Sequence, residues 1–192
     1  MLQVEEHMKS SVRDIIDGAL EVIGNTSRTE WAQDWPCQAV LVAEFINATT
    51  LMQEAIKGGT GALKSLMDKY QEHQIELIEV LKGSGDTSTM EIMSMVLIQD
   101  QHTRNVVLDL IDNQVISEKE YAWKSRPRCY STDTDIVFEM LAIKEIYRYE
   151  YLGDCTQPVM YKNMERTIYN FISSYAMKVF PVLKGGYSRS GH

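Results

Sequence analysis

The chain has 192 residues, of which 44% are hydrophobic and 24% charged, so it is long and apolar enough to bury a core. Its net charge of −8 argues against a broad phosphate-binding face and therefore against nucleic acid as a partner. No apolar run is long enough to cross a membrane, and the N-terminus lacks the pattern of a secretory signal. The three cysteines are odd in number and far apart, which is typical of free thiols in a reducing compartment. We expect a soluble intracellular protein.

The first helix is predicted over residues 2–24, where Gly24 and Asn25 end it. A short second helix is expected to begin at the capping box formed by Ser27 and Glu30. Pro36 suits the first turn of the next helix, because its missing N–H is not needed there.

Three long amphipathic helices follow. Apolar residues recur at three- and four-residue steps from Val42 to Ile56, from Leu63 to Leu81 (with Ile78 on the buried face) and from Met93 to Ile111. Gly58-Gly59 and Gly83-Ser84-Gly85 separate them, and Ser88 with Glu91 predicts a capping box for the last. Since each helix needs another apolar face, we expect an antiparallel bundle over about residues 1–116.

The remaining chain is predicted to contain a short helix after the Ser117–Glu120 cap and a small β element over about residues 126–160. The segment 136–153 is ambiguous, because helical and strand periods both fit its apolar residues. A C-terminal helix is expected over about residues 163–179, ending before Pro181 and burying Ile168, Phe171, Ile172 and Tyr175. The predicted fold class is thus mainly α.

Asp100 stands out because it falls on the apolar stripe of the last long helix. A carboxylate there needs a partner, and Arg104 is one helical turn away. A structural salt bridge or a helix edge near solvent is the favoured interpretation, and a catalytic role is the alternative. The four histidines are scattered, so we predict neither a metal site nor a nucleophile with its base.

Two further groups of residues each have two interpretations. The aromatic residues are either core residues or an interface: Trp31, Trp35, Tyr121 and Trp123. The basic residues Lys124, Arg126 and Arg128 either protect a strand edge or dock against an acidic partner surface.

The last eight residues, GGYSRSGH, imitate the beginning of a phosphate-binding loop. Gly186 and Gly191 have the spacing of its two glycines, but His192 stands where that loop has Lys. From these letters alone, a flexible tail is the better interpretation.

Four stretches together resemble dynein heavy chains: WPCQ at 35–38, DQHTRNVV at 100–107, YAWKSRPRCY at 121–130 and YEYLG at 149–153. In that family they follow one another in the linker and lead into the first AAA+ module. The resemblance covers nearly the whole chain and begins at VEEHMKSSVRD, residues 4–14.

The resemblance implies a linker-like helical region over 1–148 and a truncated start of the first AAA+ module over 149–192. It makes the C-terminal tail an incomplete phosphate loop, with degenerate nucleotide positions at Val159, Met160, Gly186, Gly191 and His192. ATP and magnesium are the family's cofactors. None is expected in this chain, because the Lys and the metal-binding hydroxyl of the loop are missing.

The resemblance further implies a mechanical linker of an ATP-driven microtubule motor that is not itself an enzyme. Structural or hinge roles are expected at Trp35, Pro36, Asp100, Arg104, Trp123, Arg126, Pro127, Tyr149, Glu150, Tyr151 and Gly153. The AAA+ ring and other dynein subunits are the implied partners, with microtubules contacted only indirectly, in the cytoskeleton or the ciliary axoneme. The alternative is a helical interaction module that docks on dynein or another partner. An autonomous nucleotide-binding protein is the least favoured interpretation.

Overall fold

The computed structural model describes residues 2–153 and 162–182. It divides the chain into two compact units, Met1–Val159 and Met160–His192. The elements of the first unit are α1 (Leu2–Val22), α2 (Arg28–Asp34), α3 (Cys37–Gly58), α4 (Thr60–Gly83), α5 (Thr87–Asp112), α6 (Tyr121–Lys124), β1 (Arg128–Ser131), β2 (Ile136–Met140) and β3 (Ile143–Ile146). The second unit contributes α7 (Lys162–Ala176). The mainly helical fold with a small sheet confirms the predicted class.

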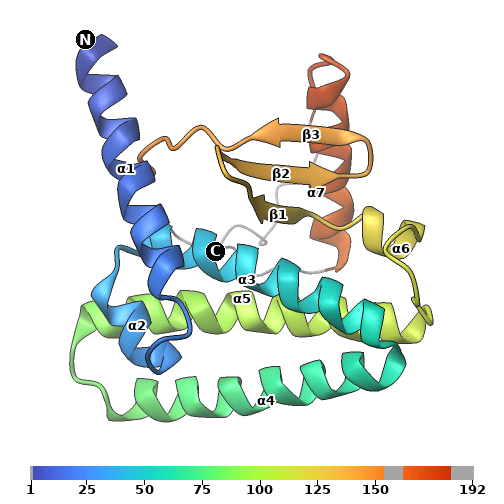
Figure 1. The fold of residues 1–192 in the computed structure, drawn as a ribbon, viewed down its shortest axis with the longest axis horizontal. Helices are drawn as coiled ribbons and strands as arrows, with labels where there is room; N and C mark the ends of the chain where they lie inside the picture. The colour runs from blue at the N-terminus through green and yellow to red at the C-terminus, as the bar shows by residue number, and fades with distance from the viewer. Residues whose placement is uncertain (1, 154–161, 183–192) are drawn as a thin grey trace. The chain divides into compact units, whose positions relative to one another are not determined.

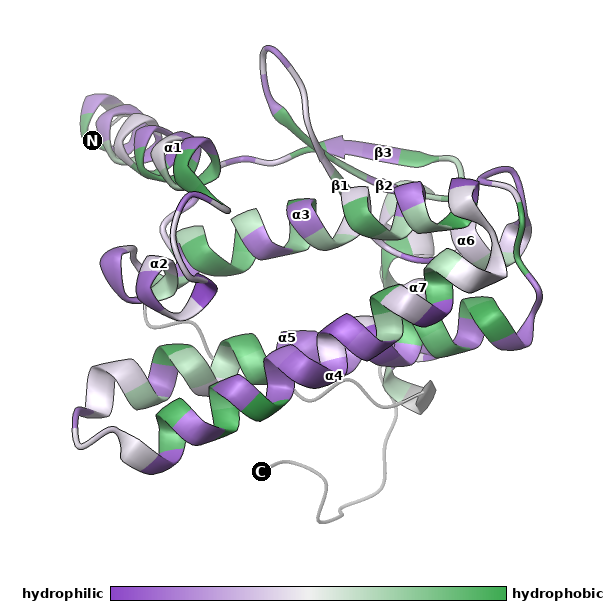
Figure 2. Ribbon diagram, turned by 60° about the horizontal axis from the view of Figure 1, so that its bottom comes forward, coloured by the Kyte–Doolittle hydropathy of each residue, from purple (hydrophilic) through white to green (hydrophobic). Residues whose placement is uncertain are grey.

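Helices α3, α4 and α5 form the antiparallel bundle (Figure 1). The single residue Gly59 joins α3 to α4, and its φ of 79° is a conformation that glycine adopts without strain. Along α4, hydrophilic and hydrophobic residues alternate in bands, as expected of a helix with one buried face (Figure 2). The short connections predicted from the glycines therefore produce neighbouring antiparallel helices.

Two helix starts illustrate the capping rules. The Ser27 hydroxyl accepts a hydrogen bond from the Glu30 amide, as predicted for α2. The prediction for α5 was wrong, because the cap is Asp86 and not the Ser88–Glu91 pair. The Asp86 carboxylate accepts from both the amide and the hydroxyl of Thr89, at 2.8 Å each. A carboxylate is the stronger acceptor for the exposed amides at a helix start.

The three strands form an antiparallel sheet in the order β1-β2-β3, on the side of α3 away from α4 (Figure 1). The ambiguous segment is therefore a hairpin, with Met140 paired to Ile143 around a two-residue turn. Within the turn, Leu141 has a φ of 53° and its amide donates to the Lys124 carbonyl. Strand β1 is held on α3 because the Cys129 amide donates to the Thr49 hydroxyl at 3.2 Å.

The core has two clusters of buried side chains. One surrounds Trp31 at the junction of α1, α2 and the beginning of α3, and the other surrounds Trp123 at the opposite end of the bundle. Each tryptophan is a core residue, whereas Tyr121 is 68% exposed, so the four aromatic residues do not form one surface. Ile78 is also exposed, which corrects its predicted place on the buried face of α4.

The second unit is described by itself. Helix α7 ends at Ala176, earlier than predicted, because Lys178 has a φ of 55° and the Val179 amide donates to the Ser174 carbonyl. These are the features of a Schellman end, so the helix stops before Pro181 is reached. Within the described residues, Phe171 and Tyr175 are exposed, contrary to their predicted burial.

Candidate functional site

Gln38 joins the beginning of α3 to the segment that leaves the sheet. Its Nε2 donates to the Tyr147 hydroxyl at 2.8 Å and to the Glu150 carbonyl at 2.7 Å. Its Oε1 accepts from the Leu152 amide at 3.1 Å. The side chain is buried, so these bonds satisfy groups that would otherwise be costly to bury. We call this arrangement the Gln38 clamp.

Tyr149 fixes the same segment from the other side. Its hydroxyl accepts from the Ile136 amide at 3.2 Å, and the Arg13 guanidinium lies 5.2 Å from its ring centre. The ring is buried and packs edge-on against Tyr147, and burial raises the pKa of the Tyr149 hydroxyl. Its φ of 53° turns the chain away from the sheet. Regular structure therefore ends at a firmly held point.

Beyond that point, the side chains turn outward. Glu150 is exposed, as are Tyr151 and Leu152, and Gly153 has a φ of 65°. Structural or hinge roles are predicted for Tyr149, Glu150, Tyr151 and Gly153, and these residues lie together where the chain leaves the sheet of the first unit. Only the first of them is buried.

A cavity of about 510 Å³ lies beside the clamp. Its lining includes Ile15 of α1, Met95 of α5, Tyr151 of the exit segment, and Trp35 and Pro36 from the start of α3. Pro36 is the residue before the first turn of α3, and the preceding Trp35 is extended, as a residue before proline prefers. The cavity is thus bordered by two of the stretches on which the resemblance rests.

Gly18 allows α1 to approach this place closely. A Cβ at position 18 would lie 3.0 Å from the Trp35 ring. This distance is shorter than most Cβ contacts, so a side chain at position 18 would require the Trp35 ring to shift. Trp31 of α2 also holds α1 in place, because its ring nitrogen donates to the Ala19 carbonyl at 3.1 Å.

A buried ionic cluster joins α2, α3 and α5. Arg28 donates to both carboxylate oxygens of Asp100 at 2.6 Å and to those of Glu44 at 2.5 and 2.8 Å. Asp100 is 1% exposed. The prediction that Asp100 needs a partner is borne out by the geometry, but the prediction that Arg104 supplies it was wrong.

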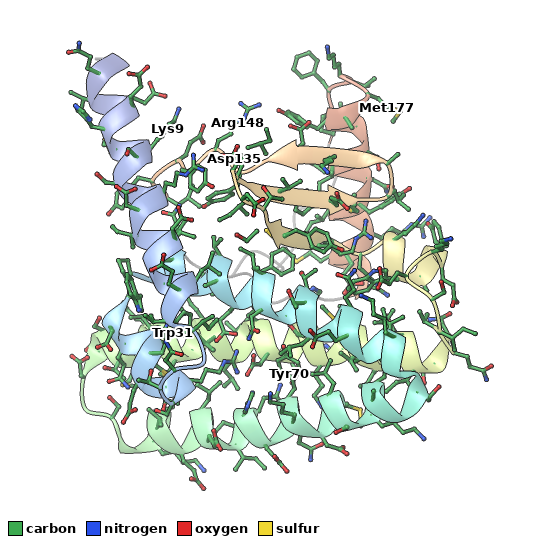
Figure 3. The ribbon with its side chains drawn as sticks, in the orientation of Figure 1. Lys9, Trp31, Tyr70, Asp135, Arg148 and Met177 are labelled. Atoms are coloured by element: carbon green, nitrogen blue, oxygen red, sulfur yellow. The ribbon has the colours of Figure 1, made fainter. Side chains whose placement is uncertain are left out.

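Burial and the opposite charges act against each other in the ionic cluster. Burial opposes the charge of Arg28, but the bond to Asp100 and the charge of Glu44 outweigh burial and raise the pKa of the guanidinium. Burial raises the pKa of Asp100 against the opposite effect of Arg28. Tyr70 projects from α4 toward the cluster (Figure 3), and its ring packs edge-on against His73. Both Asp100 oxygens are occupied, which leaves the carboxylate poorly placed to act as a catalytic base.

The residues Trp123, Arg126 and Pro127 lie where α6 passes into β1. Trp123 is fully buried, and Arg126 donates to Asp109 of α5 at 2.7 Å. Pro127 then stands directly before β1. Arg128 is buried over the Trp123 ring, so this basic group is not one uniform surface.

The proposed nucleotide positions Val159, Met160, Gly186, Gly191 and His192 lie outside the described residues. Within the described ranges, no group of three His, Cys, Asp or Glu side chains is arranged to hold a metal ion. None of the helices described there combines the length and hydropathy of a membrane span.

Three important residues were missed by sequence reasoning. In the sequence, Gln38 is visible only as the last letter of WPCQ, and nothing in the spacing around Arg28 singles it out. Glu44 carried a usable signal, because it lies between the apolar residues of α3 and is 2% exposed. A second acidic residue on a buried stripe would have indicated a shared basic partner.

No protein-family model matches the chain. Comparison with curated proteins nevertheless defines its class, since it is a homologue of axonemal dynein heavy chains over 80–93% of its length. It is 28% identical to dynein axonemal heavy chain 12 of Homo sapiens over 93% of the chain. It is 31% and 27% identical to dynein axonemal heavy chains 1 and 3 of Mus musculus, over 80% and 82% of the chain. The chain spans 6%, 4% and 4% of these three proteins. The resemblance to dynein heavy chains is confirmed.

Proposed function

We propose that this chain is a mechanical element equivalent to the C-terminal part of a dynein linker, joined near Tyr149 to the start of the first motor module. The Gln38 clamp carries this proposal. Its three hydrogen bonds tie the beginning of a long helix to the segment that leaves the helical body. A displacement of that segment would therefore move α3 as well.

The helical body has the properties that an arm needs. A close-packed core resists bending, and motion is concentrated where regular structure breaks. The Arg28 cluster cross-links three helices, and both core clusters are centred on a buried tryptophan. Gly153 follows the residues that the clamp holds and has no regular structure, so it is the proposed hinge.

On this proposal the chain itself hydrolyses no ATP, and the energy comes from the ring of the parent motor. Axonemal relatives support a cytoskeletal or ciliary location, with the AAA+ ring and other dynein subunits as partners and microtubules contacted indirectly.

Equilibrium binding of labelled ATP with magnesium to the purified chain tests whether the chain acts on nucleotide by itself. We expect no micromolar ATP binding that persists in the presence of excess pyrophosphate, and such nucleotide-specific binding would favour an autonomous nucleotide-binding protein instead.

Motor activity tests the mechanical role directly. The homologous segment of an axonemal dynein heavy chain is replaced by this chain, with Gln38→Ala and Gln71→Ala as matched variants. Gln71 is exposed on α4 and serves as the control. We expect Gln38→Ala to slow microtubule gliding several-fold while ATP turnover is retained, because the clamp transmits displacement and does no chemistry. Equal loss of gliding and turnover in both variants would contradict the proposal.

A second candidate function is a docking module. The cavity of about 510 Å³ and the exposed Tyr151 and Leu152 beside it favour this alternative. Direct binding to purified ring modules distinguishes the two functions. An arm requires only the covalently attached ring, whereas a docking module would bind separate modules, and Tyr151→Ser would weaken that binding.

A further inference from the structure

A second cavity, of about 460 Å³, lies between the sheet and the turn that follows α5. It is formed by five structural pieces: α3, the turn at 118–119, α6 and the two strands β1 and β2, with Lys144 of β3 at its border. We call it the Arg128 pocket. It belongs to the first unit and is separate from the Gln38 clamp and its cavity, whose linings share no residue with it.

Basic side chains predominate in this pocket. Its lining contains four of them, Lys119, Lys124, Arg128 and Lys144. The acidic lining residues are Glu118 and Glu139. In a chain with a net charge of −8, such a local excess of positive charge is unusual and attracts anions.

Both acidic residues are already engaged by other groups. Glu118 accepts from Gln53 at 2.7 Å and lies 3.2 Å from the Lys57 ammonium, and these contacts lower its pKa. Glu139 lies 3.1 Å from the Lys144 ammonium, but its distance to the Arg128 guanidinium is 4.0 Å. That distance is too long for a hydrogen bond, so neither carboxylate saturates the arginine.

Arg128 is the central residue of the pocket. Its side chain is only 6% exposed, and its guanidinium carbon lies 5.8 Å from the centre of the Trp123 ring. Among the described residues, neither its Nε nor the Trp123 ring nitrogen has a hydrogen-bond partner. Tyr130 already forms a side-chain hydrogen bond with the guanidinium, so the unfilled capacity is that of Nε. A buried donor without an acceptor is costly, and a ligand that accepts from it recovers that cost.

We propose that the Arg128 pocket binds a phosphate group of a small molecule. The planar guanidinium suits an oxyanion that accepts two hydrogen bonds, and the lysine ammonium groups supply further charge at the rim. A phosphate carries more than one charge, so it gains from several cations at once, whereas a single carboxylate does not. This inference concerns ligand binding alone and does not depend on the mechanical role.

The floor of the pocket is fixed before any ligand arrives. Trp123 is fully buried, and the turn between β2 and β3 is held to α6 because the Leu141 amide donates to the Lys124 carbonyl at 2.8 Å. Arg128 and Glu139 are direct partners in the β1–β2 register. Only the exposed lysines need to adjust, so little ordering opposes binding.

The test is calorimetric titration of the full chain with pyrophosphate at low ionic strength. We expect saturable binding that Arg128→Gln weakens by about tenfold or more, the effect of losing a charge-assisted hydrogen bond. The double variant Lys119→Gln/Lys124→Gln changes only exposed side chains, so it retains the fold and is expected to weaken binding several-fold. Lys82→Gln, at the far end of α4 and outside the pocket, is the control and should bind normally.

Three results would overturn the proposal. One is the absence of pyrophosphate binding to the unaltered chain. Another is equal pyrophosphate affinity of the lysine double variant and the Lys82→Gln control. This comparison remains decisive even if Arg128→Gln does not fold. The third is an Arg128-dependent preference for a tetraglutamate peptide over pyrophosphate, which would identify the ligand as an acidic protein segment.

Discussion

Arg28 and Asp100 are 72 positions apart in the sequence, and two hydrogen bonds of 2.6 Å join them in the interior. The pair connects α2 to α5, and Glu44 adds α3 through the same guanidinium. Because the two buried carboxylates share one guanidinium, the three charges depend on one another. The stability of the helical body should therefore respond strongly to the loss of any one of them.

Asp100→Ala is expected to lower the free energy of unfolding by about 3 kcal/mol, the lower end for breaking a buried pair, since Arg28 retains Glu44. Urea denaturation measures the change. The exposed Asp112 at the end of the same helix provides the control Asp112→Ala, which should stay within about 0.5 kcal/mol. Arg104→Ala should also cost less than Asp100→Ala. If Arg104→Ala and Asp100→Ala lowered the free energy of unfolding equally, Arg104 would have to be considered again as the partner of Asp100.

Gln38→Ala is expected to loosen the exit segment more than the rest of the fold. Three hydrogen bonds are lost, with a cost of about 2 kcal/mol in unfolding free energy. Hydrogen exchange should show a faster-exchanging Leu152 amide, while the amides of α4 keep their protection. Exchange at Leu152 that is unchanged from the Gln71→Ala control would refute the clamp.

Trp123→Ala is expected to destabilise the fold by about 3 to 5 kcal/mol, because a fully buried large aromatic leaves a cavity. Tyr121 is two residues away and 68% exposed, so Tyr121→Ala should change stability by less than about 0.5 kcal/mol. Thermal and urea unfolding of both variants give the comparison. Similar losses for the two would contradict the placement of Trp123 in the core.

His73 should make stability depend on pH. Burial first, and then the charges of Arg28 and Lys69, lower its pKa below the ordinary value of 6.5, while Glu76 and Glu44 act weakly the other way. The unfolded chain then binds the proton more tightly than the folded chain does. The contribution of neutral His73 to the free energy of unfolding is fully present above pH 6.5. It is lost as the pH falls from 6.5 through the lower pKa of the folded state.

Urea midpoints measured between pH 7.5 and about pH 5 check this expectation. His73→Gln should flatten the decline over this range. His7→Gln, on the exposed face of α1, is the control and should leave the slope unchanged. If the two variants give the same curve, His73 is not the group responsible.

Local features could be predicted from the sequence because their causes are local. Gly59 separates α3 from α4 through its own positive φ, and Ser27 caps α2 through a neighbouring amide. The cap of α5 shows the limit of such rules. Asp86 and Ser88 both precede helical residues, and spacing does not reveal that the carboxylate is the stronger acceptor.

Long-range contacts could not be predicted, because spacing rules search only neighbouring turns. Arg104 was chosen for Asp100 since it lies one turn away, whereas Arg28 comes from another helix. The choice between helix and strand at 136–153 was settled by distant partners in the same way. Leu141 bonds to Lys124, and Cys129 to Thr49, contacts that no local period encodes.

The close approach of Gly18 to Trp35 has a consequence for engineering the chain's length. A Cβ added at position 18 would lie only 3.0 Å from the Trp35 ring, so α1 packs closely against the residue before Pro36 at this point. Extra helical turns added ahead of Val12 would extend α1 and leave the contact between Gly18 and Trp35 unchanged. The same insertion directly after Gly18 would move Gly18 along the axis of α1, by about 1.5 Å for each added residue, and so away from the Trp35 ring.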